Sequence, residues 1–85
     1  MDDTEDLRAR LNSIELRIEK TRDQLKLKGL FHKDREATAD ELRQRYDLLA
    51  KQLDNEVGEL EAHGVHINSL EKSVLGWVNS LNLDN

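Results

Sequence analysis

The second half of the chain carries a seven-residue hydrophobic repeat without interruption. One position of the repeat holds Ala39, Tyr46, Leu53, Leu60, Ile67, Val74 and Leu81, and the other holds Leu42, Leu49, Glu56, His63, Leu70 and Trp77. Residues spaced alternately three and four apart form one narrow stripe along a helix, and such a stripe packs against other helices. The repeat therefore predicts an all-α fold and favours a function in binding or assembly.

The first half of the chain has a similar repeat, which predicts a helix over about residues 4–28. Its apolar stripe contains Leu7, Leu11, Ile14, Ile18, Thr21 and Leu25. Gly29 is the expected end of this helix, because glycine readily adopts the left-handed conformation that follows a helix. Lys26 and Lys28 precede it, where positive charge suits the end of the helix dipole.

The second helix is predicted to begin near Thr38. The sequence Thr38-Ala39-Asp40-Glu41 matches a capping box and directly precedes the long repeat. Residues 29–37 then form a connector, and the two helices form an antiparallel hairpin of the coiled-coil type. Pairing Leu25 with Leu42 also places Ile18 opposite Leu49. We expect a single helical domain over residues 1–85, with a long second helix over about residues 38–82.

The long helix would extend beyond the end of the first helix, from about Gly64 onward. Its exposed apolar stripe would then need a partner, and a symmetric dimer would bury both copies within a helical bundle. Glu56 and His63 interrupt the repeat where the first helix ends, and polar residues in such a seam set the register of packing. The predicted interaction surface consists of Ile67, Leu70, Val74, Trp77, Val78 and Leu81.

A three-helix bundle is the alternative to the long helix. Gly64 followed by Val65 resembles a glycine helix stop with its hydrophobic contact, and Asn68 with Glu71 resembles the cap of a new helix. In this alternative the chain breaks near His63-Gly64 and folds back as a third helix. The unbroken phase of the heptads favours the continuous helix.

The residues give no indication of catalysis. The chain has no cysteine, no glycine-rich phosphate loop and no Gly-x-Ser-x-Gly turn, so we expect neither an enzyme nor a bound cofactor. His63 and His66 lie one helical turn apart, which raises the hypothesis of a metal- or pH-responsive regulator. A metal site needs three or four converging ligands, so we expect His63 to lie in the core, His66 to be solvated and no metal to bind.

Charge and hydropathy narrow the expected partners and location. The net charge of −5 disfavours nucleic acid, although seven of the ten charged residues from Arg17 to Arg35 are basic. No apolar run approaches the length of a membrane span, and the most apolar segment has almost no basic residue, so we expect no membrane partner. The acidic N-terminus does not resemble a secretory signal, which favours a cytoplasmic location.

These observations predict a small cytoplasmic coiled-coil protein that acts as an adaptor or scaffold. Its expected partner is a second copy of the chain in a homodimer, with a helix of another protein as the runner-up. The alternative function is the regulator built around His63 and His66.

Overall fold

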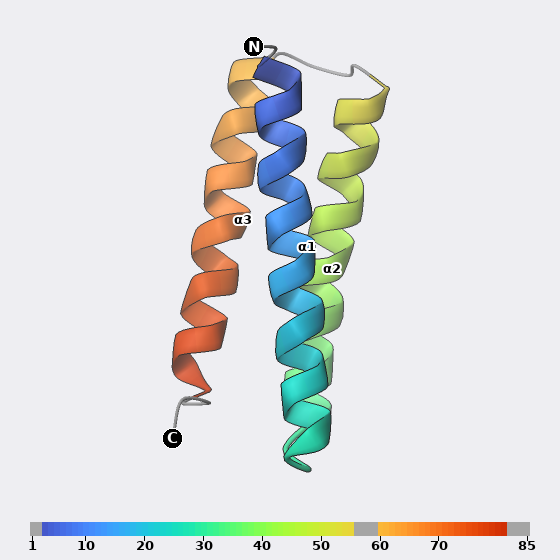
Figure 1. The fold of residues 1–85 in the computed structure, drawn as a ribbon, viewed down its shortest axis with the longest axis vertical. Helices are drawn as coiled ribbons and strands as arrows, with labels where there is room; N and C mark the ends of the chain where they lie inside the picture. The colour runs from blue at the N-terminus through green and yellow to red at the C-terminus, as the bar shows by residue number, and fades with distance from the viewer. Residues whose placement is uncertain (1–2, 56–59, 82–85) are drawn as a thin grey trace.

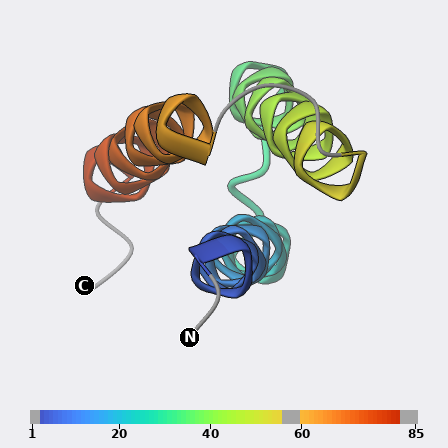
Figure 2. The ribbon, with the colours of Figure 1, turned by 90° about the horizontal axis from the view of Figure 1, so that it is seen from above.

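The computed structural model describes residues 3–55 and 60–81, and in these residues it contains three α-helices and no strand. They are α1 (Asp3–Leu27), α2 (Lys33–Asp54) and α3 (Leu60–Ser80). Consecutive helices run in opposite directions, so that α1 and α3 point the same way (Figure 1). Viewed from the end, the helices occupy the corners of a triangle, and each packs against the other two (Figure 2). The all-α prediction is confirmed.

The expected unbroken helix over residues 38–82 is wrong. α2 ends at Asp54, and the N–H group of Asn55 donates to the carbonyl of Lys51 at 3.0 Å. Asparagine and aspartate are poor helix formers because their side chains compete for backbone hydrogen bonds. The alternative of three helices describes the fold, but Gly64 lies inside α3 and the chain breaks before Leu60.

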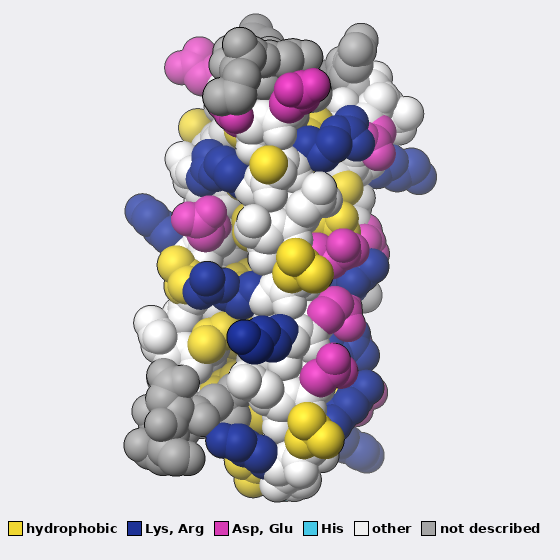
Figure 3. Space-filling view, viewed as in Figure 1, with side chains coloured by type: hydrophobic (Ala, Val, Ile, Leu, Met, Phe, Trp, Pro, Cys, Tyr) yellow, Lys and Arg dark blue, Asp and Glu magenta, His cyan; other side chains and the backbone are white. Residues whose placement is uncertain are grey.

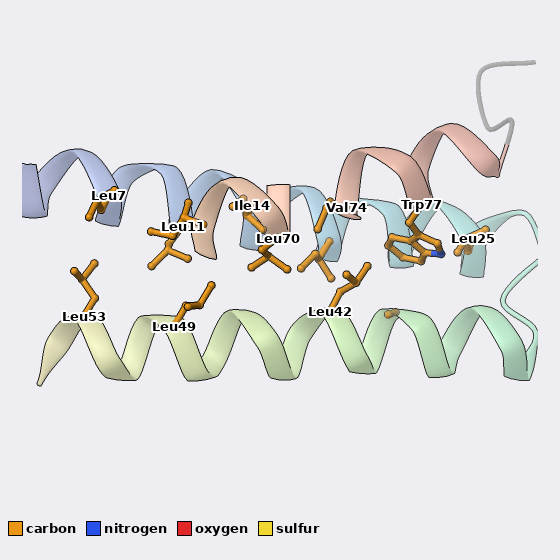
Figure 4. Packing of buried hydrophobic residues seen from close by; sticks show 13 residues of the cluster. Leu7, Leu11, Ile14, Leu25, Leu42, Leu49, Leu53, Leu70, Val74 and Trp77 are labelled. Carbon is orange, nitrogen blue, oxygen red and sulfur yellow. The ribbon is translucent and has the colours of Figure 1, made fainter. Parts of the chain in front are cut away.

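All three helices contribute their apolar stripes to one core. Leu7 points towards Leu53, and Trp77 reaches into the space between Leu42 and Leu25 (Figure 4). Burial of each such side chain stabilises a fold by about 1.5–3 kcal/mol. Among the residues that the structure describes, the buried apolar ones are Leu7, Leu11, Ile14, Ile18, Leu25, Ala39, Leu42, Leu49, Leu53, Ile67, Leu70, Val74 and Trp77.

The end of α1 is closed by Gly29, as the sequence predicted. Gly29 has φ +69°, in the left-handed region where glycine carries no steric penalty. Its N–H group donates to the carbonyl of Lys26 at 3.1 Å, and the N–H group of Leu30 donates to the carbonyl of Leu25 at 2.8 Å. This pair of bonds is a Schellman motif, which satisfies carbonyls that the helix end leaves unpaired.

The second helix begins earlier than predicted, at Lys33. His32 precedes it in extended conformation without a side-chain cap, and Asp34 and Glu36 supply the acidic first turn. Thr38 therefore lies inside the helix, where its hydroxyl donates to the carbonyl of Asp34 at 3.1 Å. The predicted capping box is wrong, since acidic residues one turn earlier meet the same electrostatic need.

The earlier start also changes the register between α1 and α2. Arg8 pairs with Asp54 at 2.5 Å and Arg43 pairs with Glu19 at 2.7 Å. Leu7 accordingly lies opposite Leu53 (Figure 4). The expected pairing of Leu25 with Leu42 is wrong by one heptad, because a 3-4 repeat packs equally well after such a shift.

Each edge of the triangle is bridged by an arginine. Arg43 joins α2 to Glu15 and Glu19 of α1, Arg10 joins α1 to Asn68 and Glu71 of α3, and Arg45 joins α2 to Ser69 and Ser73 of α3. These contacts are partly exposed, so each contributes little free energy. They mark which flank of each helix faces its neighbours.

We predict a monomer in solution, because the single chain buries all three apolar stripes. Light scattering should give 9.9 kDa at every concentration. Trp77→Glu should unfold the bundle, since it places a charge where Trp77 is only 8% exposed. A stable dimer that Trp77→Glu converts to a helical monomer would contradict this prediction and support the dimer expected from the sequence.

Two glycine substitutions should change stability in opposite directions. Gly76 lies inside α3, and a methyl group there would meet no neighbouring side chain within 4 Å, so Gly76→Ala should raise the free energy of unfolding by about 0.5–1 kcal/mol. Gly29→Ala should lower it by about 1–2 kcal/mol, because alanine is strained at positive φ. Urea denaturation followed by circular dichroism measures the free energy of unfolding of both variants. A change in the same direction for both would contradict the different roles assigned to the two glycines.

Candidate interaction surfaces

The predicted interaction surface lies mainly in the core. The exposed fractions are 1% for Ile67, 0% for Leu70, 1% for Val74 and 8% for Trp77. Val78 and Leu81 are partly buried and pack against the same cluster. The stripe is therefore occupied by α1 and α2, which removes the reason for expecting a dimer through it.

Of the two polar residues that interrupt the repeat, Glu56 and His63, the structure describes only His63. This side chain is 4% exposed, and its Nε2 atom has no hydrogen-bond partner among the described residues. The next residue, Gly64, approaches the Leu7 side chain of α1. Glu56 lies outside the described residues, so its role in setting the register stays a prediction.

His63 and His66 have different surroundings. His66 is exposed and borders a shallow groove between α2 and α3, with Arg45, Leu48 and Ser69. The expected burial of His63 and exposure of His66 are both confirmed. In the described part of the chain, no group of three His, Cys, Asp or Glu side chains gathers to hold a metal. The hypothesis of a metal- or pH-responsive regulator stays a prediction.

The face between α1 and α2 is closed by a charged network around Arg43. Its guanidinium lies 2.7 Å from Glu19, 3.1 Å from Glu15 and 3.3 Å from Asp47, and 5.3 Å from the centre of the Tyr46 ring. Burial alone would lower the pKa of Arg43, but these carboxylates raise it overall. Burial is the main cause of the raised pKa of Tyr46, and the Glu15 carboxylate, which accepts its hydroxyl hydrogen bond, adds to it.

The face between α1 and α3 is closed only in its first half. Arg10 of α1 donates to the side chain of Asn68 and lies 3.6 Å from the Glu71 carboxylate. Beyond this point two adjoining hollows follow the two helices, and both are bordered by Ser13 and Arg17. We call the hollowed part the α1–α3 groove.

The α1–α3 groove combines apolar side chains with basic ones, and the Glu71 carboxylate, which pairs with Arg10, also lines it. Leu16 of α1 is 69% exposed and Leu75 of α3 is 36% exposed, while Val78 is half-buried between them and the core. Arg17 and Lys20 also line the groove, and neither forms an ion pair with another described residue. Yellow and dark blue side chains, with magenta ones among them, lie along this side of the molecule (Figure 3).

Sequence reasoning missed Leu16 and Leu75, because it followed only the heptad stripe. Leu16 lies two residues after buried Ile14, and Leu75 lies one residue after buried Val74. Apolar residues outside the main stripe are the available signal, but a single exposed leucine is common on protein surfaces. Only the packing of α3 beside α1 brings the two together.

Comparison of the chain with family models, curated proteins and solved structures found no match. Within the described residues, no helix has both the length and the apolar character required to cross a membrane.

Tyr46 should titrate above its ordinary pKa of about 10 in the native protein. As the only tyrosine, it can be followed by its phenolate absorbance, and its midpoint should fall in urea. Since folding favours the protonated phenol, its stabilising contribution is complete below the unfolded pKa and is lost as the pH rises through the folded pKa. Glu15→Gln should lower the native midpoint, and an unchanged midpoint would contradict the contact between Tyr46 and Glu15.

Proposed function

We propose that this chain is a small non-catalytic helical adaptor that binds an amphipathic helix of another protein in the α1–α3 groove. The observation that carries the proposal is the position of exposed Leu16 and Leu75 on the two sides of one groove. Exposed apolar residues gathered along a concave surface are typical of protein contact sites.

A helix suits the shape of this groove. α1 and α3 are neighbouring parallel helices, and a further helix packs against such a pair by placing its side-chain ridges between them. Apolar anchors at positions i, i+3, i+4 and i+7 would contact Leu16, Leu75 and Val78. The assembly would then resemble a four-helix bundle with one helix supplied by the partner.

The charge of the groove favours acidic residues beside those anchors. Arg17 and Lys20 border the apolar surface and lack carboxylate partners among the described residues. Glutamates on the flanks of the incoming helix would supply them. Complementary charge of this kind selects partners and speeds their encounter more than it adds affinity.

A second copy of this chain is a less suitable occupant. The stripe that was expected to form the dimer is buried in the core, so it is not available for a contact between two chains. A homodimer would instead have to form through the α1–α3 groove. A symmetric contact brings the same surface of two copies together, which would place the Arg17 and Lys20 side chains near their own copies. We therefore propose a partner helix of opposite charge.

Titration of the isotope-labelled protein with a synthetic amphipathic helix tests this function. The peptide carries leucines at i, i+3, i+4 and i+7 flanked by glutamates, and we expect amide shifts in the NMR spectrum near Ser13, Leu16, Arg17, Leu75 and Val78. A version with lysines in place of the glutamates should bind at least about tenfold more weakly.

Paired substitutions provide the control for this titration. Leu16→Ser with Leu75→Ser should weaken binding by about tenfold or more, which corresponds to a loss of about 1.4 kcal/mol or more. The control pair Leu48→Ser with Val65→Ser removes apolar side chains that are 57% and 62% exposed outside the groove, and it should leave binding unchanged. Equal losses in both pairs, shifts at another face, or a mass that doubles without peptide would contradict the proposal.

A further inference from the structure

The turn between α1 and α2 forms an apolar tip at the end of the bundle farthest from the N-terminus (Figure 1). Leu27 is 87% exposed, Leu30 is 36% exposed, and Phe31 is half-buried against the core. Leu27 is the most exposed large apolar residue of the described chain. Phe31 is anchored against the core, whereas Leu27 and Leu30 are presented to solvent at a projecting edge.

Basic side chains surround this tip. Lys26 and Arg22 lie over the ring of Phe31, with their charged groups 5.5 and 5.8 Å from its centre. Lys28 and Lys33 are exposed on either side of the turn. Dark blue and yellow side chains accordingly occur together towards this end of the molecule (Figure 3).

The tip is the positive end of an acidic chain. Residues 20–37 contain six basic and three acidic residues, which gives this segment a net charge of +3. Because the whole chain has a net charge of −5, the remaining residues together carry −8. Glu5 and Asp6 at the start of α1, Asp54 at the end of α2 and Glu61 at the start of α3 are exposed. These three helix ends lie at the opposite end of the bundle (Figure 1). Such a separation of charge orients a molecule in an electric field, with the tip directed towards a negative surface.

The shape of the tip is set before any contact. The Schellman bonds of Gly29 and Leu30 define the path of the turn, and the Arg35 guanidinium donates to the carbonyl of Leu30 at 2.9 Å. The N–H group of His32 also donates to that carbonyl, at 3.0 Å. Leu27 and Leu30 are thus presented by an ordered backbone, which lowers the entropy lost on binding.

We propose that the α1–α2 tip binds an anionic lipid surface. Leu27 and Leu30 enter the region between the headgroups and the acyl chains, and Lys26, Lys28 and Lys33 contact the headgroup phosphates. Apolar insertion and attraction to anionic lipids are the two components of peripheral membrane binding, and neither is strong alone. This contact crosses no bilayer and uses a surface separate from the α1–α3 groove, so it does not depend on the proposed function.

A lipid surface accounts for the tip better than nucleic acid does. Phosphates of nucleic acid would also pair with the lysines, but they offer no apolar region for Leu27. Stacking on bases needs an accessible aromatic face, and Arg22 and Lys26 lie over the Phe31 ring. The sequence-based expectation of no membrane partner rested on the apolar segment of α3. The stripe of that segment is buried in the fold, so the expectation does not concern the tip.

Vesicle sedimentation tests the proposal on the full chain. Vesicles of phosphatidylcholine with about 30 mol% phosphatidylserine should bind the protein at about 50 mM salt, and pure phosphatidylcholine should not. Binding should fall by about tenfold or more at about 500 mM salt, where screening is strong. Absence of binding to the anionic vesicles at low salt would overturn the proposal.

Matched variants separate the tip from the rest of the surface. Leu27→Ser and the pair Lys26→Gln with Lys33→Gln should each lower the partition coefficient by about fivefold or more. Leu48→Ser and the pair Lys51→Gln with Lys72→Gln change residues outside the tip, and they should lower it less than about twofold. Equal losses for both sets would overturn the assignment to the tip, provided that circular dichroism shows every variant folded.

A fluorescent label reports insertion directly, because the chain contains no cysteine of its own. An environment-sensitive dye on Leu27→Cys should shift to the blue on anionic vesicles, and the same dye on Leu48→Cys should not. Tighter binding to single-stranded RNA than to the vesicles, with Leu27→Ser without effect, would overturn the proposal and assign the lysines to nucleic acid.

Discussion

The fold depends on burial of the apolar stripe of α3 between α1 and α2. Ile67, Leu70, Val74 and Trp77 are almost fully buried there, and at about 1.5–3 kcal/mol each they contribute about 6–12 kcal/mol. Stabilities of small domains fall in the same range, about 5–15 kcal/mol. A single chain with an unbroken second helix would expose all four side chains. The break after Asp54 therefore allows one chain to bury this stripe by itself.

This burial also determines which surfaces are left for function. The helices close the α1–α2 face with the Arg43 network and the upper part of the α1–α3 face with Arg10. Besides the shallow groove between α2 and α3, two surfaces stay open, the α1–α3 groove and the tip at the α1–α2 turn. Both combine exposed leucines with basic side chains, although the chain as a whole is acidic. An adaptor that holds a partner helix at one surface and a lipid headgroup at the other is consistent with this division.

Sequence reasoning succeeded where the structure depends on local chemistry. Gly29 adopts the left-handed conformation that ends α1, and the heptad positions identify nearly every buried residue. It failed where two patterns were locally equivalent. Thr38 offered a capping box, but Asp34 and Glu36 supply an equally favourable first turn. The shift of α2 by one heptad followed, because the repeat itself does not distinguish registers that differ by seven residues.

The preserved heptad phase was the most misleading signal. Each helix needs its own 3-4 spacing to pack, but nothing prevents two separate helices from sharing a phase, so continuity of the pattern does not establish continuity of the helix. Asp54 and Asn55 were the better indicators of a break, since both favour helix ends. Sequence reasoning did not consider them, and their local effect is small compared with that of tertiary packing.

By itself, the sequence determined that the chain is helical, which residues form the apolar stripes and where α1 ends, because these depend on side-chain spacing and on the conformational freedom of glycine. Only the tertiary structure decided that the stripe of α3 is core rather than an interface, and that Leu16 and Leu75 border one groove. Those outcomes depend on which helices lie side by side, and that choice is made by the total apolar surface buried rather than by any local pattern.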